Sequence, residues 1–272
     1  MSAWRSKVVG DTENRIKSLW RMYSIYENYK NQYDFTKVSN DTVDNIGMEL
    51  GIHKENKKCA VCGHISEQKK VNIKPDTKPF YPTQDADFRP IEPFRDSMVL
   101  WLEKCPRCGY VDNDISNINS TLLSTIDSKD YLCFQKTVNS NIKNSDIAKK
   151  FVLYSLAKKH VGEYEDAFKN LLCAIWIFDD IRAPDYARLY RRRACNIFDE
   201  YFDIKKVNVR EALQYVDVLR RCCMFEKAIM VCDALPIEPN PIYEKLKIMQ
   251  SRLAESRDDN KYFIESALHS EE

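Results

Sequence analysis

The chain has 272 residues, of which 44% are apolar and 31% are charged, and its formal net charge is +1. This length suits one large domain or two smaller ones, and the composition excludes a disordered chain. The near-zero net charge excludes a global attraction to nucleic acid or to membranes. No apolar run reaches the roughly 20 residues of a membrane span, and the N-terminus lacks the apolar core of a secretory signal. We therefore expect a cytoplasmic protein, and the few glycines and prolines favour helices.

The N-terminal residues 1–56 are predicted to form a helical segment. Apolar and aromatic residues recur at three- and four-residue steps within 11–34, which is typical of an amphipathic helix. A second short helix is expected over 41–50, with Gly51 as its stop signal. The aromatic stripe of the first helix favours packing against the rest of the protein, and the alternative is a docking surface for a partner helix.

Two cysteine pairs predict a metal site. The sequences Cys59-Ala60-Val61-Cys62-Gly63 and Cys105-Pro106-Arg107-Cys108-Gly109 each place two thiols two residues apart, with a glycine after the second. Such turns aim both sulfurs at one point, and two of them supply the four soft ligands of a closed tetrahedral site. Zinc in a structural role is the expected metal, and iron in a rubredoxin-like site is the alternative. The predicted ligands are Cys59, Cys62, Cys105 and Cys108, whereas His64 is expected to stay outside the set.

Residues 57–119 have the layout of a zinc-ribbon-like module with some β-structure. Extended stretches at 70–73 and 98–102 accompany the two cysteine pairs, and 42 residues separate Cys62 from Cys105. The proline-rich excursion, residues 74–95, is longer than a compact ribbon needs and is expected to be an irregular loop or a small insertion. Its carboxylates are expected to be solvated or to cap backbone amides; these are Asp85, Asp87 and Glu92.

Residues 120–145 read as a polar linker, and residues 146–272 as a helical domain with a core separate from that of the metal module. Two antiparallel helices fit 146–180, and the turn with Gly162, Tyr164 and Ala167 resembles that of a tetratricopeptide repeat. Further helices are expected from Pro184, over 209–221, from about Met224, and over 241–255. The predicted fold is thus mainly α, with the small metal module followed by a tetratricopeptide-like array of helical hairpins.

An arginine-rich stretch near residue 190 is the candidate partner-binding surface. Its arginines and tyrosines could contact phosphates, but many aspartates and glutamates surround it, which favours a solvated helix face with intrahelical ion pairs. The candidate contact residues are Tyr186, Arg188, Tyr190, Arg191, Arg192 and Arg193.

The order of these features resembles a group of uncharacterised bacterial proteins that join a zinc-ribbon-like module to tetratricopeptide-like helices. The resemblance rests on Asp85-Ala86-Asp87-Phe88, the Cys-Pro-x-Cys-Gly-Tyr turn at 105–110, and Ala174-Ile175-Trp176. It implies metal ligation by the four cysteines and implies no activity. Because the chain has no phosphate-binding glycine loop, dinucleotide fingerprint or nucleophile elbow, we expect a non-enzymatic scaffold or adaptor for a protein partner. A nucleic-acid-associated factor is the alternative, and an iron redox protein is a third interpretation.

Overall fold

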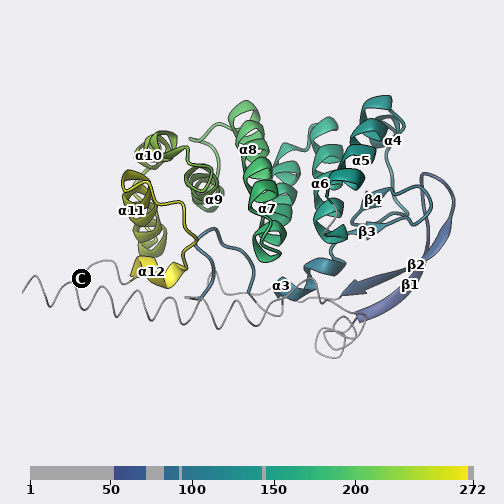
Figure 1. Cartoon of the computed structure of the whole chain (residues 1–272), viewed down its shortest axis with the longest axis horizontal. Coiled ribbons are helices and arrows are strands. Elements are labelled where there is room, and N and C mark those ends of the chain that lie inside the picture. Colours follow the sequence, from purple (N-terminus) through teal and green to yellow (C-terminus); the bar gives the residue numbers. More distant parts are fainter. Residues whose placement is uncertain (1–51, 72–82, 92–93, 143–144, 269–272) are drawn as a thin grey trace, which may run out of the picture. The chain divides into compact units, whose positions relative to one another are not determined.

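A computed structural model describes residues 52–71, 83–91, 94–142 and 145–268, all within the compact unit Ser39–Glu272. The helices predicted over 11–34 and 41–50, and the acidic C-terminal residues, lie outside the described residues. Ten α-helices and two small antiparallel sheets make up the secondary structure of the described part (Figure 1). The mainly α fold with a small β-containing module is therefore confirmed.

Each cysteine pair lies at the tip of a two-stranded antiparallel sheet. Strand β1 (Ile52–Lys58) pairs with β2 (Ile65–Val71), and Lys58 lies opposite Ile65. Strand β3 (Glu103–Lys104) pairs with β4 (Val111–Asp112), and Lys104 lies opposite Val111. Because β1 begins at Ile52, strand structure enters the segment 1–56 that was expected to be helical.

The strand expected over 98–102 is wrong. Helix α3 (Phe94–Ser97) runs into the 3-10 turn η2 (Met98–Leu100), and the following Leu102 is buried. The stretch lacks the alternation of apolar and polar residues that distinguishes a half-buried strand from a short helical turn. Ser97 also accepts a hydrogen bond from Trp101 Nε1 at 2.8 Å, which stabilises the turn.

The expected linker over 120–145 is also wrong, because two helices occupy most of it. Helix α4 (Ser120–Ile126) is capped by the Asn119 side chain, and α5 (Lys129–Asn141) is capped by Ser128. Two of the polar residues that suggested a linker, Asn119 and Ser128, are helix caps, which favour helix starts rather than irregular chain. The apolar residues between them pack inward, as shown by the buried Leu122, Ile126, Tyr131 and Val138.

The helical hairpin over 146–180 is confirmed. Helix α6 (Asp146–His160) packs against α7 (Tyr164–Asp180), and Gly162 between them has a φ of +82°. Ala167 is fully buried, and its carbonyl accepts a hydrogen bond from Ser155 Oγ at 2.6 Å. A small residue is therefore needed where the two helices approach each other.

The remaining helices follow in chain order, each packed on its neighbour (Figure 1). Helix α8 (Pro184–Tyr201) begins at Pro184 as expected, and α9 (Val209–Arg220) packs against it. Helix α10 (Phe225–Ala234) contacts both α9 and α11 (Pro241–Glu255), and the short α12 (Ile264–Leu268) packs on α11. None of the described helices is long and apolar enough to cross a membrane.

The expectation of separate cores for the metal module and the helical array is wrong. The largest apolar cluster joins Met98, Leu102 and Val111 of the module to residues of α6, α7, α8 and α9. A second cluster contains Cys59 and Cys105 together with residues of α4, α5 and α6. The two parts therefore share apolar contacts, and a substitution in the core of one part is expected to alter packing in the other.

Replacing Ala167 by Trp tests the close approach of α6 and α7. We expect Ala167→Trp to lower the free energy of unfolding by about 3 kcal/mol, because the site has no room for an indole ring. Chemical denaturation measures this change. Ala234→Trp, at an exposed position of α10, is the control and should change stability by less than about 0.5 kcal/mol. Equal stabilities of the two variants would contradict the close contact.

Candidate metal centre

The two cysteine turns have the same backbone geometry. The amide of Gly63 donates to the Cys59 carbonyl and that of Gly109 to the Cys105 carbonyl, both at 2.9 Å. The amide of Cys59 donates to the His64 carbonyl and that of Cys105 to the Tyr110 carbonyl, both at 2.8 Å. Gly63 and Gly109 have φ values of +70° and +74°, which residues other than glycine rarely adopt. The glycine after each pair is thus explained by the turn.

The four sulfurs form a compact set. Cys59 Sγ lies 3.7 Å from Cys108 Sγ, and Cys62 Sγ lies 3.6 Å from Cys105 Sγ. All four sulfurs lie within 4.8 Å of one another. A tetrahedral ion with metal–sulfur bonds of about 2.3 Å requires sulfur–sulfur edges of about 3.8 Å. The four predicted ligands therefore come together as a metal-binding set, which suits zinc and also iron.

The environment of the thiols favours binding of a cation. Cys59 and Cys105 are buried, and Cys62 and Cys108 are half-buried. Burial raises the pKa of the Cys59 and Cys108 thiols, while a hydrogen bond from the His64 backbone lowers the pKa of Cys62 to about 7. A bound cation would favour the thiolates and offset the desolvation of the buried sulfurs. His64 contributes backbone atoms to this arrangement, and its ring is outside the ligand set.

The second turn is held against the helices. Gln135 Nε2 of α5 donates to the Gly109 carbonyl at 3.2 Å, and the Ala60 amide donates to the Ile115 carbonyl at 2.8 Å. Tyr110 is buried and donates a 2.7 Å hydrogen bond to Asp112. The second cysteine turn is therefore tied to α5 by the Gln135 hydrogen bond as well as by the shared apolar cluster.

The part of the excursion that the structure describes is buried, not solvated. Asp85 and Asp87 are only 4% and 5% exposed, so the expectation that they are solvated is wrong. The alternative, that a carboxylate caps a backbone amide of the loop, is confirmed for Asp87, whose Oδ1 accepts from the Arg89 amide at 3.2 Å. Asp87 accepts a 2.6 Å hydrogen bond from Trp176 Nε1 on α7, and its carbonyl accepts one of 3.0 Å from Gln214 on α9. Glu92 lies outside the described residues. An irregular loop can thus carry its carboxylates into the helical array when the array supplies donors.

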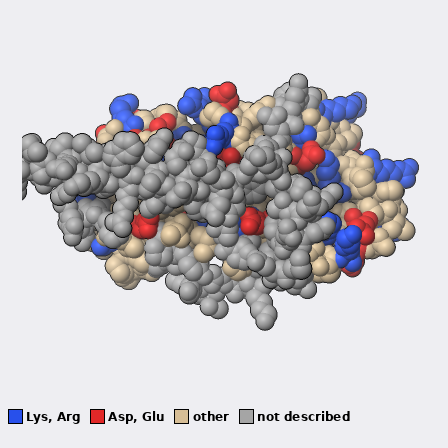
Figure 2. Space-filling view, turned by 60° about the horizontal axis from the view of Figure 1, so that its bottom comes forward, with Lys and Arg blue, Asp and Glu red and all other residues tan. Residues whose placement is uncertain are grey.

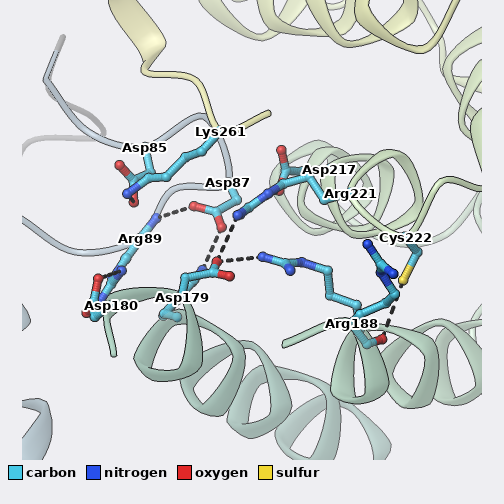
Figure 3. Close-up of polar contacts among 12 residues, drawn as sticks. Asp85, Asp87, Arg89, Asp179, Asp180, Arg188, Asp217, Arg221, Cys222 and Lys261 are labelled. Atoms are coloured by element: carbon cyan, nitrogen blue, oxygen red, sulfur yellow. Dashed lines mark hydrogen bonds and ion pairs between the residues drawn. The ribbon is translucent and has the colours of Figure 1, made fainter. Parts of the chain in front are cut away.

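An ion-pair network surrounds this buried segment (Figure 3). Arg89 makes a bidentate pair with Asp180, and Arg95 contacts the same carboxylate at 2.6 Å. The next carboxylate, Asp179, accepts from Arg191 at 2.5 Å and from Arg221 at 2.9 Å. The network links the excursion, α7, α8 and the end of α9, so it fixes how these parts meet.

The network changes the ionisation of its carboxylates. Burial alone would raise the pKa of Asp179, but the Arg221 and Arg191 guanidiniums lower it to about 2. Burial raises the pKa of Asp87 to about 6, and the nearby Asp217 and Asp85 carboxylates add to this. Asp179 is therefore stabilised as an anion, whereas Asp87 carries its charge at a cost.

The candidate partner-binding residues fall into different environments. Arg188 and Arg192 are exposed, and Tyr186 and Arg193 are half-buried. Tyr190 and Arg191 are buried, so they are not on the surface where a partner would contact them. Tyr190 stacks on Phe178 at 5.3 Å, and Arg191 pairs with α7 rather than within its own helix. The spacing of Arg191 from Ala187, Ala194 and Phe198 places it on the apolar stripe of α8, a signal that the run of arginines obscured.

We expect Cys105→Ser to abolish metal binding and to loosen α4 and α5 as well as the metal module, because these helices share its apolar cluster. Hydrogen exchange should become at least about tenfold faster in α4 and α5, while α11 changes little. Metal analysis and mass spectrometry of exchanged peptides measure both effects. Cys133→Ser, at an exposed position of α5, is the control. Unchanged metal content in Cys105→Ser would contradict the assignment.

Asp179→Asn is expected to destabilise the protein by about 3 kcal/mol at pH 7, because it leaves Arg191 without its anion and leaves Arg221 with Asp217 alone, at 3.7 Å. The folded-state pKa of Asp179, about 2, is below its unfolded value of about 3.9. Its contribution is therefore complete above about pH 4 and is lost as the pH falls toward 2. Denaturation curves should show the wild type and variant converging over this range, whereas Asp166→Asn, at an exposed position of α7, stays close to the wild type throughout. A constant gap between Asp179→Asn and the wild type would contradict this.

Comparison with known proteins adds no family to this description. No family model matches the chain, and neither the curated proteins nor the solved structures contain a significant match. What the chain itself establishes is a four-cysteine cluster that could hold a metal ion, joined to a mostly helical body.

Proposed function

We propose that this protein is a cytoplasmic, non-enzymatic scaffold in which zinc stabilises the β-containing module and the helical array presents a surface to a protein partner. The observation that carries the metal assignment is the pair of sulfur–sulfur distances, 3.7 Å and 3.6 Å, close to the edge of a zinc tetrathiolate. Four cysteines complete the coordination of zinc and leave no position for a catalytic water. This favours a structural role.

The size of the module supports a structural role for the metal. Its sheets have only two strands each, and such sheets are at best marginally stable alone. The metal would join the two cysteine turns across the 42 residues between them and so limit the conformations of the unfolded chain. A cation at this site therefore supplies stability that the small sheets lack.

The surface offered to a partner is on α8. Arg188, Leu189 and Arg192 are all exposed, and Leu189 keeps 44% of its surface accessible. An apolar side chain between two cations suits an acidic partner segment that also carries an apolar residue. We call Arg188, Leu189 and Arg192 the α8 surface. It contains the two exposed arginines of the partner-binding stretch predicted from sequence.

Metal analysis tests the first half of the proposal. The purified protein should contain one zinc ion per chain and should be colourless, and thiol-reactive reagents should modify the four ligands faster after chelation. Visible absorption with one iron per chain would instead support the iron redox interpretation. A folded protein that contains no metal under reducing conditions would contradict both.

Nucleic acid is the second candidate ligand, because the exposed Arg188 and Arg192 make no ion pair within the described part of the chain and could contact phosphates. Against it, the formal net charge of the chain is only +1, and Lys and Arg lie near Asp and Glu where the face in Figure 2 is not grey.

Affinity capture with and without nuclease separates the two candidates. We expect the partner to survive nuclease and to be lost with Leu189→Glu, because a charge replaces the apolar contact. Lys205→Glu, at an exposed position outside the α8 surface, is the control. Loss of all partners on nuclease treatment, with binding that weakens steeply in salt, would support nucleic acid instead.

A further inference from the structure

The buried segment, residues 84–89, lies against the helical array in the way a bound peptide would. It belongs to no helix or longer strand, and it contacts α7, α9, α11 and the chain that leads into α12. These contacts come from residues more than 85 positions away in sequence, such as Trp176 and Gln214. The array therefore holds this segment through side chains and main-chain atoms that are far from it in sequence.

Main-chain pairing gives this contact the character of strand addition. The Ala86 amide donates to the Tyr262 carbonyl at 2.9 Å, and the Ile264 amide donates to the Gln84 carbonyl at 2.8 Å. Asp85 and Phe263 form an antiparallel bridge between these bonds. Backbone pairing of this kind supplies affinity that does not depend on side chains, while side-chain sites supply specificity.

Three side chains of the segment supply the specificity. Asp87 accepts the Trp176 hydrogen bond, and Arg89 makes its bidentate pair with Asp180. Phe88 is 1% exposed, and its ring meets the ring of Tyr243 edge-on at a centroid separation of 5.8 Å. The Arg210 guanidinium lies 5.0 Å from the centre of the Phe88 ring. The site thus selects an acid, an aromatic ring and a base in consecutive positions.

The backbone of the segment adapts to the site. Phe88 has a φ of +61°, a left-handed conformation that aromatic residues rarely adopt. Gln84 Nε2 donates to the carbonyls of Phe88 and Arg89, both at 3.0 Å, and closes the turn. The anchoring contacts therefore outweigh the local backbone preference, as in peptide recognition sites that impose a conformation.

We propose that this face of α7, α9 and α11 is a peptide-recognition surface for partner segments of the Asp-x-Asp-Phe-Arg type, and that residues 84–89 occupy it in cis. The inference rests on the scaffold function proposed above and adds a second surface, separate from the α8 surface, with a partner chemistry of its own. Because the excursion is tethered on both sides by the cysteine turns, the internal segment has a high effective concentration at the surface. A partner segment in trans binds when that internal contact is weakened.

Phe88→Ala tests the surface by removing the central anchor and leaving the receiving residues unchanged. A labelled peptide with the sequence of residues 83–91 is titrated against the variant and the wild-type protein. We expect the variant to bind the peptide at least about tenfold more tightly than the wild type does, because the vacated aromatic site accepts the added ring. The same peptide with Phe replaced by Ala should lose this gain.

Thermal melting provides a second readout. The Phe-containing peptide should raise the Tm of Phe88→Ala, and Asp180→Ala in the same background should weaken binding by removing the partner of the peptide's arginine. If Phe88→Ala does not fold, Arg89→Ala is titrated with the parent peptide and with the same peptide carrying Ala at the position that corresponds to Arg89. Equal affinity for both peptides, or no binding to either folded variant, overturns the proposal.

Zinc content measured on the same samples separates the two proposals. A folded variant that keeps one zinc ion and binds neither peptide overturns the recognition surface alone. A wild-type protein that folds without metal overturns the zinc scaffold, and peptide binding to Phe88→Ala still supports the surface.

Discussion

The convergence of four thiols constrains the rest of this structure. The sulfurs of Cys59, Cys62, Cys105 and Cys108 lie within 4.8 Å of one another, although 42 residues separate the two turns. Holding these ends together closes a long loop, and closure is the entropic cost that a metal would offset. Part of this loop packs into the helical array, where residues 84–89 are buried. Folding of the metal-binding set and folding of the array therefore depend on each other, because the same loop takes part in both.

Buried ion pairs bind this loop to the array, and burying such charges costs free energy. Asp179 and Asp180 end α7, and four arginines from the excursion, α8 and the end of α9 converge on them. Such pairs contribute little net stability compared with apolar contacts of the same size, because each charge loses its hydration. They contribute much to specificity, since a shifted loop or helix would leave a charge unpaired. The network thus explains why an irregular segment has a defined position.

The sequence predicted the local features and missed the long-range ones. The cysteine spacing, the glycine after each pair and the helical periodicity of 146–180 depend on neighbours within a few residues, and these predictions are confirmed. The burial of Asp87 depends on Trp176 and Gln214, which lie far away in sequence. The polar residues around Asp87 therefore could not predict its burial. The linker failed for a different reason: Asn119 and Ser128 serve as caps, and their polarity concealed two short helices. Arg191 could have been placed correctly from the apolar stripe of α8.

The shared cores make the metal-binding set and the array interdependent. Met98, Leu102 and Val111 of the metal module join the main apolar cluster, and Ala157 of α6 joins the cluster around Cys59 and Cys105. Loss of a cation would weaken the module first, and with it the link between the two cysteine turns that flank the excursion. The segment at 84–89 would then hold its place on the array by its own contacts and by those of Arg95 and Met98. If the array recognises a partner through that same face, the internal segment competes with the partner for it, and the presence of the metal sets how strongly it competes. A structural ion would then influence partner binding without any chemistry at the metal.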